Sequence, residues 1–390
     1  MASRSSTSNS NETVFGVNEM RLSARQWIAA LAIVVLIANF IPVAAKRFET
    51  FSPGADYRIP YALSKDYWLY QRRAELLDDR HRIPVIGDSV VWGEYVRPDG
   101  TLSHFLNKEG GENDQFVNCG VNGLFPLALE GLIRGYGGSF RSRKVIVQCN
   151  LLWLTSPKAD LSIEQEEKFN HSRLVPQFSI RIPCYRASTA ERLSAVFERH
   201  CEFFAWTSHL QSAYYEQKSL AQWTLKEEEG ASQRYPNAWR NPIEPLKGGL
   251  PSEPQSDPQR GPDSPRHKRW NAGGGELTHF EWVSLDKSLQ WQAFTRLIKL
   301  LQSRNNDVFV ILGPFNEHMI AEDQRPGYFN LRDTAAAALK KSGAQVMVPD
   351  ALPSNLYADA SHPLTEGYAM LAAKSKSDET FAAWLKSDER

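Results

Sequence analysis

Short hydrophobic runs alternate with longer, more polar segments over most of this 390-residue chain. The runs are four to six residues long, rich in Val and Ile, and lack a strict alternation of apolar and polar positions. That pattern is typical of strands that are buried on both faces of a parallel sheet. The predicted strands are 83–86, 115–118, 144–149, 307–312 and 344–348.

Helix-like segments lie between the predicted strands, over 102–107, 126–136, 288–303 and 331–341. Strands that alternate with helices predict an α/β domain. We expect a doubly wound parallel sheet of five strands between two layers of helices. This domain covers residues 81–390.

A long insertion interrupts the alternation, because the third and fourth predicted strands lie much further apart than the roughly dozen residues that a crossover needs. The insertion covers residues 155–280. Ser188 and Glu191 form a capping-box sequence, which predicts a helical region from there toward Glu229. Residues 230–276 are dense in Pro, Gly, Ser and charge, so we expect a loop or a disordered linker there.

The longest apolar run lies near the N-terminus, where residues 27–45 read WIAALAIVVLIANFIPVAA. A bilayer takes roughly 17–25 apolar residues to cross, so this run can just span one. We predict one retained transmembrane helix, with a disordered segment over 1–26 before it and a linker with a lead-in helix over 46–80 after it. A cleaved signal peptide is the alternative, because Val43 and Ala45 fit a small-residue cleavage pattern.

The charges that flank this run give only a weak bias for its orientation. A single N-terminal span before a large domain most often exports that domain, so we expect the domain outside the cytoplasm. The chain has 45 basic and 45 acidic residues, and this balance gives no basic field for a nucleic-acid partner.

The four cysteines are not arranged as metal ligands, because none belongs to a CxxC pair. Cys119 and Cys149 end strands on either side of the first strand and should lie too far apart to pair. Cys184 and Cys201 lie in the insertion, and whether they form a disulfide depends on export of that region.

The first predicted strand ends in Gly87-Asp88-Ser89. Ser89 therefore lies at the carboxyl end of a parallel strand, where open α/β sheets bind ligands. The tripeptide alone also fits a simple turn, because Gly and Asp favour turns. Asp359 and His362 follow the fifth predicted strand and should reach the same sheet edge. A serine hydroxyl needs a base to take its proton and a group to orient that base, and these two residues supply both.

Three further candidate site residues follow predicted strands. The backbone amide of Gly123 and the side-chain amide of Asn150 are candidates to stabilise an oxyanion. A buried asparagine that merely ends a strand is the alternative for Asn150. His318 follows the fourth strand and is a candidate for a substrate contact, with a plain polar loop as the alternative.

These blocks, in this order, resemble those of the SGNH (GDSL-like) hydrolase superfamily. Four blocks carry the resemblance: Gly87-Asp88-Ser89, the glycine Gly123, the asparagine Asn150 and Asp359-x-x-His362.

The resemblance covers about residues 81–150 and 305–385 and leaves the insertion unexplained. It departs from the family at Cys149, which stands where the family usually has a glycine before the asparagine. The resemblance implies the flavodoxin-like strand order of the family and no metal or organic cofactor.

The resemblance also implies the roles of a serine esterase or acyltransferase. Ser89 would attack an ester carbonyl, and His362 would take the proton and return it to the leaving alcohol. Asp359 would hold the imidazole in the correct tautomer. The amides of Ser89 and Gly123 and the side chain of Asn150 would bind the oxyanion.

The anchor and the insertion look like those of SGNH-like proteins that add or remove O-acyl groups on cell-surface polysaccharides. The expected substrate is therefore an ester or acylated carbohydrate of the cell envelope, and envelope-assembly proteins are candidate partners. A lipid esterase at the bilayer and an inactive scaffold of a surface-assembly complex are the alternatives. The intact Asp-x-x-His pair argues against the scaffold.

Overall fold

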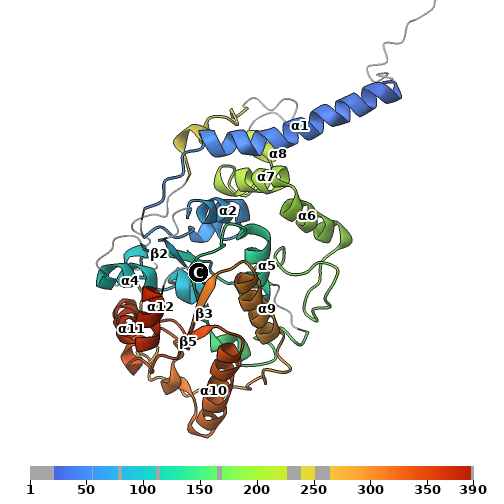
Figure 1. Cartoon of the computed structure of the whole chain (residues 1–390). Helices are drawn as coiled ribbons and strands as arrows, with labels where there is room; N and C mark the ends of the chain where they lie inside the picture. The colour runs from blue at the N-terminus through green and yellow to red at the C-terminus, as the bar shows by residue number, and fades with distance from the viewer. Residues whose placement is uncertain are drawn as a thin grey trace, which may run out of the picture.

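Five parallel strands form one sheet in the order β2-β1-β3-β4-β5 (Figure 1). The predicted five-stranded parallel sheet is confirmed, and each strand lies within two residues of its predicted bounds. The computed structural model describes residues 22–54, 56–77, 81–110, 115–164, 169–225, 239–250 and 264–387. The strands are β1 (Ile83–Gly87), β2 (Phe116–Gly120), β3 (Lys144–Cys149), β4 (Asp307–Leu312) and β5 (Gln345–Met347).

The predicted helices are also present, with some different bounds. The helix predicted over 126–136 agrees at both ends, whereas the one predicted over 331–341 begins six residues earlier, because Pro326 is tolerated in the first turn. The helices are α1 (Ala24–Phe48), α2 (Tyr67–Glu75), α3 (Ser89–Trp92), α4 (Leu102–Gly110), α5 (Pro126–Tyr136), α6 (Thr189–His200), α7 (Glu202–Ala213), α8 (Leu220–Thr224), α9 (Leu289–Ser303), α10 (Arg325–Lys341), α11 (Thr365–Ser377) and α12 (Glu379–Lys386).

Side chains of the strands alternate between two hydrophobic clusters. In β3, Val145 and Val147 belong to a cluster with apolar residues of α5 and α9, whereas Ile146 belongs to a second cluster with residues of α4, α11 and α12. Apolar contacts therefore cover both faces of the sheet, which explains why its strands read as uninterrupted apolar runs.

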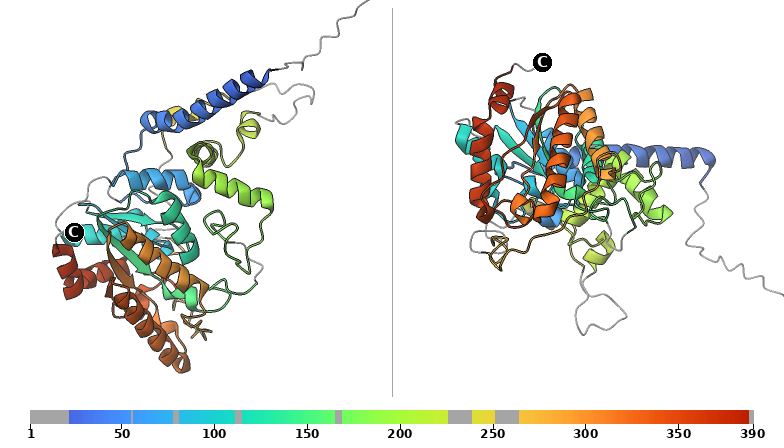
Figure 2. Two further views of the ribbon diagram at one scale, coloured as in Figure 1. Left: turned by 45° about the vertical axis from the view of Figure 1, so that its right-hand side comes forward. Right: turned by 90° about the horizontal axis from the view of Figure 1, so that it is seen from below.

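The helical part of the insertion consists of three short helices where the sequence predicts one helical region. The capping box of Ser188 and Glu191 starts α6 as expected. Cys201 has an extended backbone (φ −127°, ψ 108°) and separates α6 from α7. A second capping box, formed by Ser219 and Gln222, starts α8. Figures 1 and 2 show these helices near α1, away from the sheet.

Part of the predicted linker is packed against the domain. Ser264 is buried, and Trp270 donates hydrogen bonds from Nε1 to the Ser354 carbonyl (2.7 Å) and from its backbone amide to the Tyr357 carbonyl (2.9 Å). Residues 264–276 therefore form a loop, as one of the two alternatives expects, and Trp270 packs this loop against the domain. Composition cannot show this packing, because it does not weigh one large anchoring side chain against many polar ones. Residues 230–238 and 251–263 lie outside the described residues.

The N-terminal apolar run forms α1, which extends three residues beyond the predicted run at each end. Ser23 and Gln26 form a capping box that starts the helix, so residues 24–26 are helical and not disordered as predicted. Residues 1–21 lie outside the described residues. By length and composition α1 could cross a membrane, and most of its side chains are exposed.

A buried cluster of charged and polar side chains, the α1 clamp, attaches the end of α1 to α2 and α7. Its members are Glu49, Asp66, Arg72, His209 and Tyr214. Glu49 caps the C-terminus of α1, pairs with Arg72 and accepts from the Tyr214 hydroxyl. His209 is fully buried, and its Nε2 and Nδ1 lie 2.8 Å from Glu49 Oε1 and 2.6 Å from Asp66 Oδ2.

Candidate functional site

Ser89 is the first residue of α3, directly beyond the end of β1. Asp88 caps this short helix, because its Oδ1 accepts from the Val90 amide (2.8 Å). The helix lies against β2 at Gly120, where a Cβ would be 2.5 Å from the Trp92 amide nitrogen. The glycine therefore permits the close approach that presents Ser89 at the sheet edge.

Ser89, His362 and Asp359 form a continuous chain of hydrogen bonds. The Nε2 of His362 lies 2.8 Å from Ser89 Oγ, and its Nδ1 lies 2.8 Å from each carboxylate oxygen of Asp359. Asp359 Oδ1 also accepts from the backbone amides of Ser361 (2.9 Å) and His362 (3.0 Å), which fixes the turn between the two residues. When Nδ1–H donates to Asp359, Nε2 is the acceptor that faces the Ser89 hydroxyl.

Asp359 and His362 stabilise each other's charged forms. Burial raises the pKa of Asp359, but His362 and the two backbone amides outweigh it and bring the pKa down to about 2. Burial lowers the pKa of His362, but Asp359 first, and then Asp88 and Glu94, raise it above the ordinary 6.5. An imidazole of raised basicity beside a serine hydroxyl is suited to accept its proton.

Asn150 has contacts that differ from those the resemblance implies. Its side chain has no exposed area, and Nδ2 donates to Asp88 Oδ2 (2.9 Å) and to Ser361 Oγ (3.3 Å). Its Oδ1 accepts from the Leu152 amide (2.9 Å). Both amide protons are used inside the protein, so this geometry does not support the predicted oxyanion role. The buried asparagine at a strand end, the alternative from the sequence, describes it better.

Asp88 connects the serine turn to the end of β3. It accepts hydrogen bonds from Val90 and Asn150 and from Nε1 of Trp153 (3.1 Å). Burial raises the pKa of this carboxyl although all three bonds oppose it. Sequence reasoning missed Trp153, because nothing in the spacing of a tryptophan after a strand distinguishes a buried donor from ordinary packing.

The backbone amides of Ser89 and Gly123 remain as candidate oxyanion donors. Gly87 and Gly120 are partners in the register of β1 and β2, so the loops that carry Ser89 and Gly123 leave adjacent strand ends. Gly123 has φ +77°, a conformation that glycine adopts readily. Within the part of the chain that the structure describes, neither amide donates a hydrogen bond, so both can donate to a ligand.

The insertion supports the loop that carries Gly123. The Nε2 of His171 donates to the Asn122 carbonyl (2.8 Å), and the Tyr67 hydroxyl lies 3.1 Å from Nδ1 of the same ring. Burial lowers the pKa of His171 to about 4, so the ring is neutral and can accept from Tyr67. A Cβ on Gly123 would lie 2.8 Å from Nδ2 of Asn170. No sequence signal predicts this support, because a lone histidine in an insertion has no motif around it.

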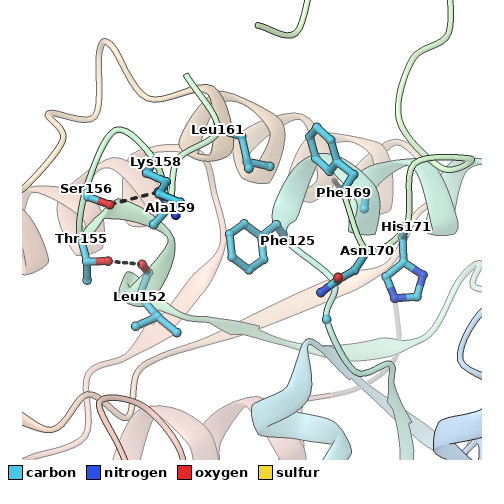
Figure 3. Close-up of a pocket in the computed structure, with 12 residues that line it drawn as sticks. Phe125, Leu152, Thr155, Ser156, Lys158, Ala159, Leu161, Phe169, Asn170 and His171 are labelled. Atoms are coloured by element: carbon cyan, nitrogen blue, oxygen red, sulfur yellow. Dashed lines mark hydrogen bonds between the residues drawn. The ribbon is translucent and has the colours of Figure 1, made fainter. Parts of the chain in front are cut away.

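A cavity of about 340 Å³ opens beside Gly123, between the start of α5 and the first part of the insertion (Figure 3). Phe125, Leu152 and Phe169 contribute apolar walls, and polar groups such as Thr155 lie among them. Gly123 therefore belongs both to the wall of this cavity and to the candidate oxyanion site.

His318 makes a backbone contact where the sequence suggests a substrate contact. Its side chain is exposed, and Nε2 lies 2.9 Å from the Leu352 carbonyl. The neighbouring Asn316 donates from Nδ2 to the Asp359 carbonyl (3.1 Å) and from its backbone to the Ala360 carbonyl (2.8 Å). This segment therefore braces the loop of Asp359, and a substrate contact of His318 stays a prediction.

Tyr95 is a further site residue that the sequence analysis missed. Its ring meets that of His362 edge-on, with centroids 5.3 Å apart. Burial raises the pKa of Tyr95, and the Asp359 carboxylate raises it further. The hydroxyl therefore stays protonated in the neighbourhood of the carboxylate that orients His362. No sequence signal separates this tyrosine from a core aromatic.

Metal ligands and disulfides do not contribute to the described site. Among the described residues, no group of three or more His, Cys, Asp or Glu side chains is arranged to bind a metal ion. No disulfide joins any of the four cysteines, all of which the structure describes, so the pairing of Cys184 with Cys201 that the sequence leaves open is not formed.

Comparisons with known proteins do not place the chain in a family. No model of a known protein family matches it, and no curated protein matches it closely enough to count as a relative. The function is therefore inferred from the geometry of the site.

Proposed function

We propose that the protein is a serine esterase or acyltransferase of the SGNH type, with Ser89 as its nucleophile. The observation that carries the proposal is the unbroken hydrogen-bonded chain from Ser89 through His362 to Asp359, with 2.8 Å between the atoms at each step. A nucleophile, a base and a group that orients the base, all within hydrogen-bond reach, are what acyl transfer by serine requires. The five-stranded sheet and the shared edge of the strands agree with the SGNH arrangement.

The proposed reaction proceeds in two halves. Ser89 Oγ forms a bond to the ester carbonyl carbon while His362 Nε2 takes the hydroxyl proton, and the carbonyl π electrons move to oxygen. The tetrahedral intermediate then expels the alcohol, which receives the proton from His362 and leaves an acyl-serine. Water or an acceptor hydroxyl attacks that acyl group by the same steps in reverse. Asp359 keeps its charge throughout and stabilises the imidazolium.

The intermediate oxyanion would accept from the amides of Ser89 and Gly123. Backbone amides fixed at a helix start and in a glycine turn stabilise a developing negative charge without reorganising during the reaction. The support that His171 gives to the preceding Asn122 keeps the Gly123 amide in place. A third donor is not required for this mechanism.

The proposed substrate is an O-acyl ester on an exported carbohydrate or envelope polymer. The cavity beside Gly123 supports this choice, because its aromatic walls can pack against a sugar ring while Thr155 and Asn170 offer hydrogen bonds to hydroxyls. An anchored domain outside the cytoplasm would meet such polymers. A lipid esterase is the second candidate, favoured by the apolar helix α1.

The first prediction tests the chemistry on ester substrates. Full-length protein in detergent is assayed with acetyl, butyryl and long-chain nitrophenyl esters. We expect hydrolysis of the short esters, and a loss of about 10³-fold or more in kcat/KM for Ser89→Ala because the nucleophile is gone. A preference for long chains would favour the lipid esterase.

The matched control is Ser303→Ala, which changes an exposed serine at the end of α9. It should keep the wild-type rate. A serine-reactive phosphonate should label the wild type and the control but not Ser89→Ala. Equal rates in wild type and Ser89→Ala, together with absence of labelling, would contradict the proposed function.

A further inference from the structure

The α1 clamp makes α1 and the domain one rigid unit rather than two parts joined by a tether. Glu49, the residue that ends α1, is bonded to α2 through Arg72 and to α7 through His209. Lys46 adds ion pairs to Glu202 (2.5 Å) and Glu75 (3.1 Å). The direction of α1 therefore fixes the orientation of the domain.

The contact between α1 and the domain begins inside the apolar run. Pro42 is buried and Ala38, Ile41 and Ala45 are half-buried, and these four residues share one helix face at the spacing of i, i+3, i+4 and i+7. The run of residues 27–45 is about 28 Å long at ~1.5 Å per residue, close to the ~30 Å of a hydrocarbon core. If the run fills that core, the part of the domain that packs on residues 38–45 lies in the outer part of the core, and the part that packs on the residues after Ala45 lies at the membrane surface.

A patch of exposed apolar side chains lies at this level. We call it the interfacial patch, and its members lie on α8 and in the segment 239–246. Trp239 is 71% exposed and Ile243 is 61% exposed, values that are unusual for side chains of this size. The members are Leu220, Leu225, Trp239, Ile243 and Leu246.

Hydrogen bonds connect the interfacial patch to the end of α1. The Tyr214 hydroxyl donates to Glu49, and the hydroxyl of the adjacent Tyr215 donates to the Pro242 carbonyl (3.0 Å). A Cβ on Gly249 would lie 3.9 Å from Thr50 Oγ1. Figure 1 shows the segment 239–250 (yellow) next to the C-terminal end of α1, whereas the view from below in Figure 2 shows α8 apart from α1. The segment that carries Ile243 and Leu246 is therefore held close to the C-terminal end of α1.

We propose that the interfacial patch is a second membrane contact, inserted at the headgroup level of the bilayer that α1 crosses. Tryptophan is enriched at that level, where its ring meets both apolar and polar surroundings. The charges of this segment are paired, Lys247 with Glu244 (2.8 Å) and Arg240 with Glu216 (3.8 Å), and can remain among headgroups. The proposal rests on the membrane anchor and is independent of the chemistry at Ser89.

The test places an environment-sensitive fluorophore at single cysteines of the full-length protein in phosphatidylcholine vesicles. The background is Cys201→Ser, because the other three native cysteines are buried. Trp239→Cys and Ile243→Cys report on the interfacial patch. Leu31→Cys reports on α1, and Lys340→Cys is the matched control on α10, at the opposite end of the molecule (Figure 1).

We expect a blue-shifted emission at positions 31, 239 and 243, with quenching when part of the lipid carries a nitroxide on its acyl chain. Position 340 should show neither change. If position 31 is quenched while 239 and 243 behave like 340, the bilayer does not cover the patch and the inference is overturned, although the anchor stands. If position 31 is not quenched, α1 is not in the bilayer and both fail.

Discussion

At the scale of single residues, the site depends on how a few polar side chains divide their hydrogen bonds. Asp359 uses one oxygen for both the imidazole and two backbone amides, so its position and its charge are fixed together. Asp88, one residue before the serine, makes no contact with the serine hydroxyl and instead ties the turn to β3 through Asn150. The two carboxylates therefore have different tasks: one orients a base and the other holds the turn.

The second prediction concerns the dependence of activity on pH. Only neutral His362 can accept the Ser89 proton, and the pKa of His362 lies above its ordinary 6.5. The value of kcat/KM should therefore rise with pH, with a midpoint above 6.5. Asp359→Asn removes the charge that stabilises the imidazolium, so the midpoint should fall and the rate should drop by about 10²–10⁴-fold. The measurement is a pH profile of kcat/KM for both proteins.

A midpoint that stays in place in Asp359→Asn would contradict the role of this carboxylate. Asp323→Asn is the control, because Asp323 is an exposed carboxylate whose partner is the exposed His279. It should leave both the midpoint and the rate unchanged.

The third prediction separates a structural role of Asn150 from an oxyanion role. Asn150→Ala leaves the buried Asp88 carboxylate and the Leu152 amide each short of a partner, so the free energy of unfolding should fall by about 1–3 kcal/mol. The folded fraction, counted by active-site titration, should keep kcat within about tenfold. A loss of about 10²–10³ in kcat at unchanged KM would instead assign Asn150 to the oxyanion site.

Residue roles could be predicted from the sequence only where several short motifs follow one another along the chain in the order that the resemblance requires. Ser89, Asp359 and His362 were predicted because each follows a strand, and parallel strands bring their carboxyl ends to one edge. Tyr95 and His171 were not, because their roles arise from contacts between segments whose relative position no local pattern encodes. Asn150 was placed correctly at the strand end, but its hydrogen bonds depend on where Ser361 comes to lie.

At the scale of elements, the helices that touch the sheet were easier to predict than those of the insertion. α5 and β3 have the predicted bounds because their apolar residues pack against other helices and strands of the sheet domain, and this packing produces a regular apolar pattern in the sequence. In the insertion, the break at Cys201 falls within a helical pattern, and it is tertiary contact of α7 with α1 and α2 that places it. Trp270 shows the same limit, since one half-buried indole packs a segment whose composition favours a loop.

The fourth prediction concerns the α1 clamp and the pH dependence of stability. Burial lowers the pKa of His209, but Asp66 and Glu49 outweigh it and raise the pKa to about 9 from 6.5. A raised histidine pKa stabilises the fold fully below pH 6.5 and loses its contribution as the pH rises through about 9. The free energy of unfolding should therefore fall by up to about 3 kcal/mol over that range.

Glu49 determines how the stability of the clamp changes at acid pH. Burial raises the pKa of Glu49, but His209, Tyr214 and Arg72 lower it below 4.5, so its contribution is present above pH 4.5 and is lost as the pH falls. The clamp should be most stable between about pH 4.5 and 6.5. Chemical unfolding in detergent at several pH values measures this, and His209→Gln should remove the loss between pH 6.5 and 9. The exposed His279→Gln is the control, and an unchanged pH profile in His209→Gln would contradict the argument.

At the scale of the whole molecule, a parallel sheet was predictable because both of its faces are covered and its strands must therefore be apolar throughout. The relation of α1 to the rest was not predictable. An apolar run of 19 residues predicts a span but says nothing of what its ends touch, and the clamp joins residues that are far apart in sequence.

The clamp has a mechanical consequence. An enzyme on a flexible stalk samples a thick shell above the membrane and works wherever its substrate happens to be. A domain held rigidly on a transmembrane helix stays at one distance from the bilayer. It meets its substrate only by diffusing in the plane of the membrane. If the proposed function and the membrane anchor hold, the target groups have to lie at one distance from the membrane, so that the thickness and order of the surrounding polymer, rather than its amount, would govern how much of it is modified.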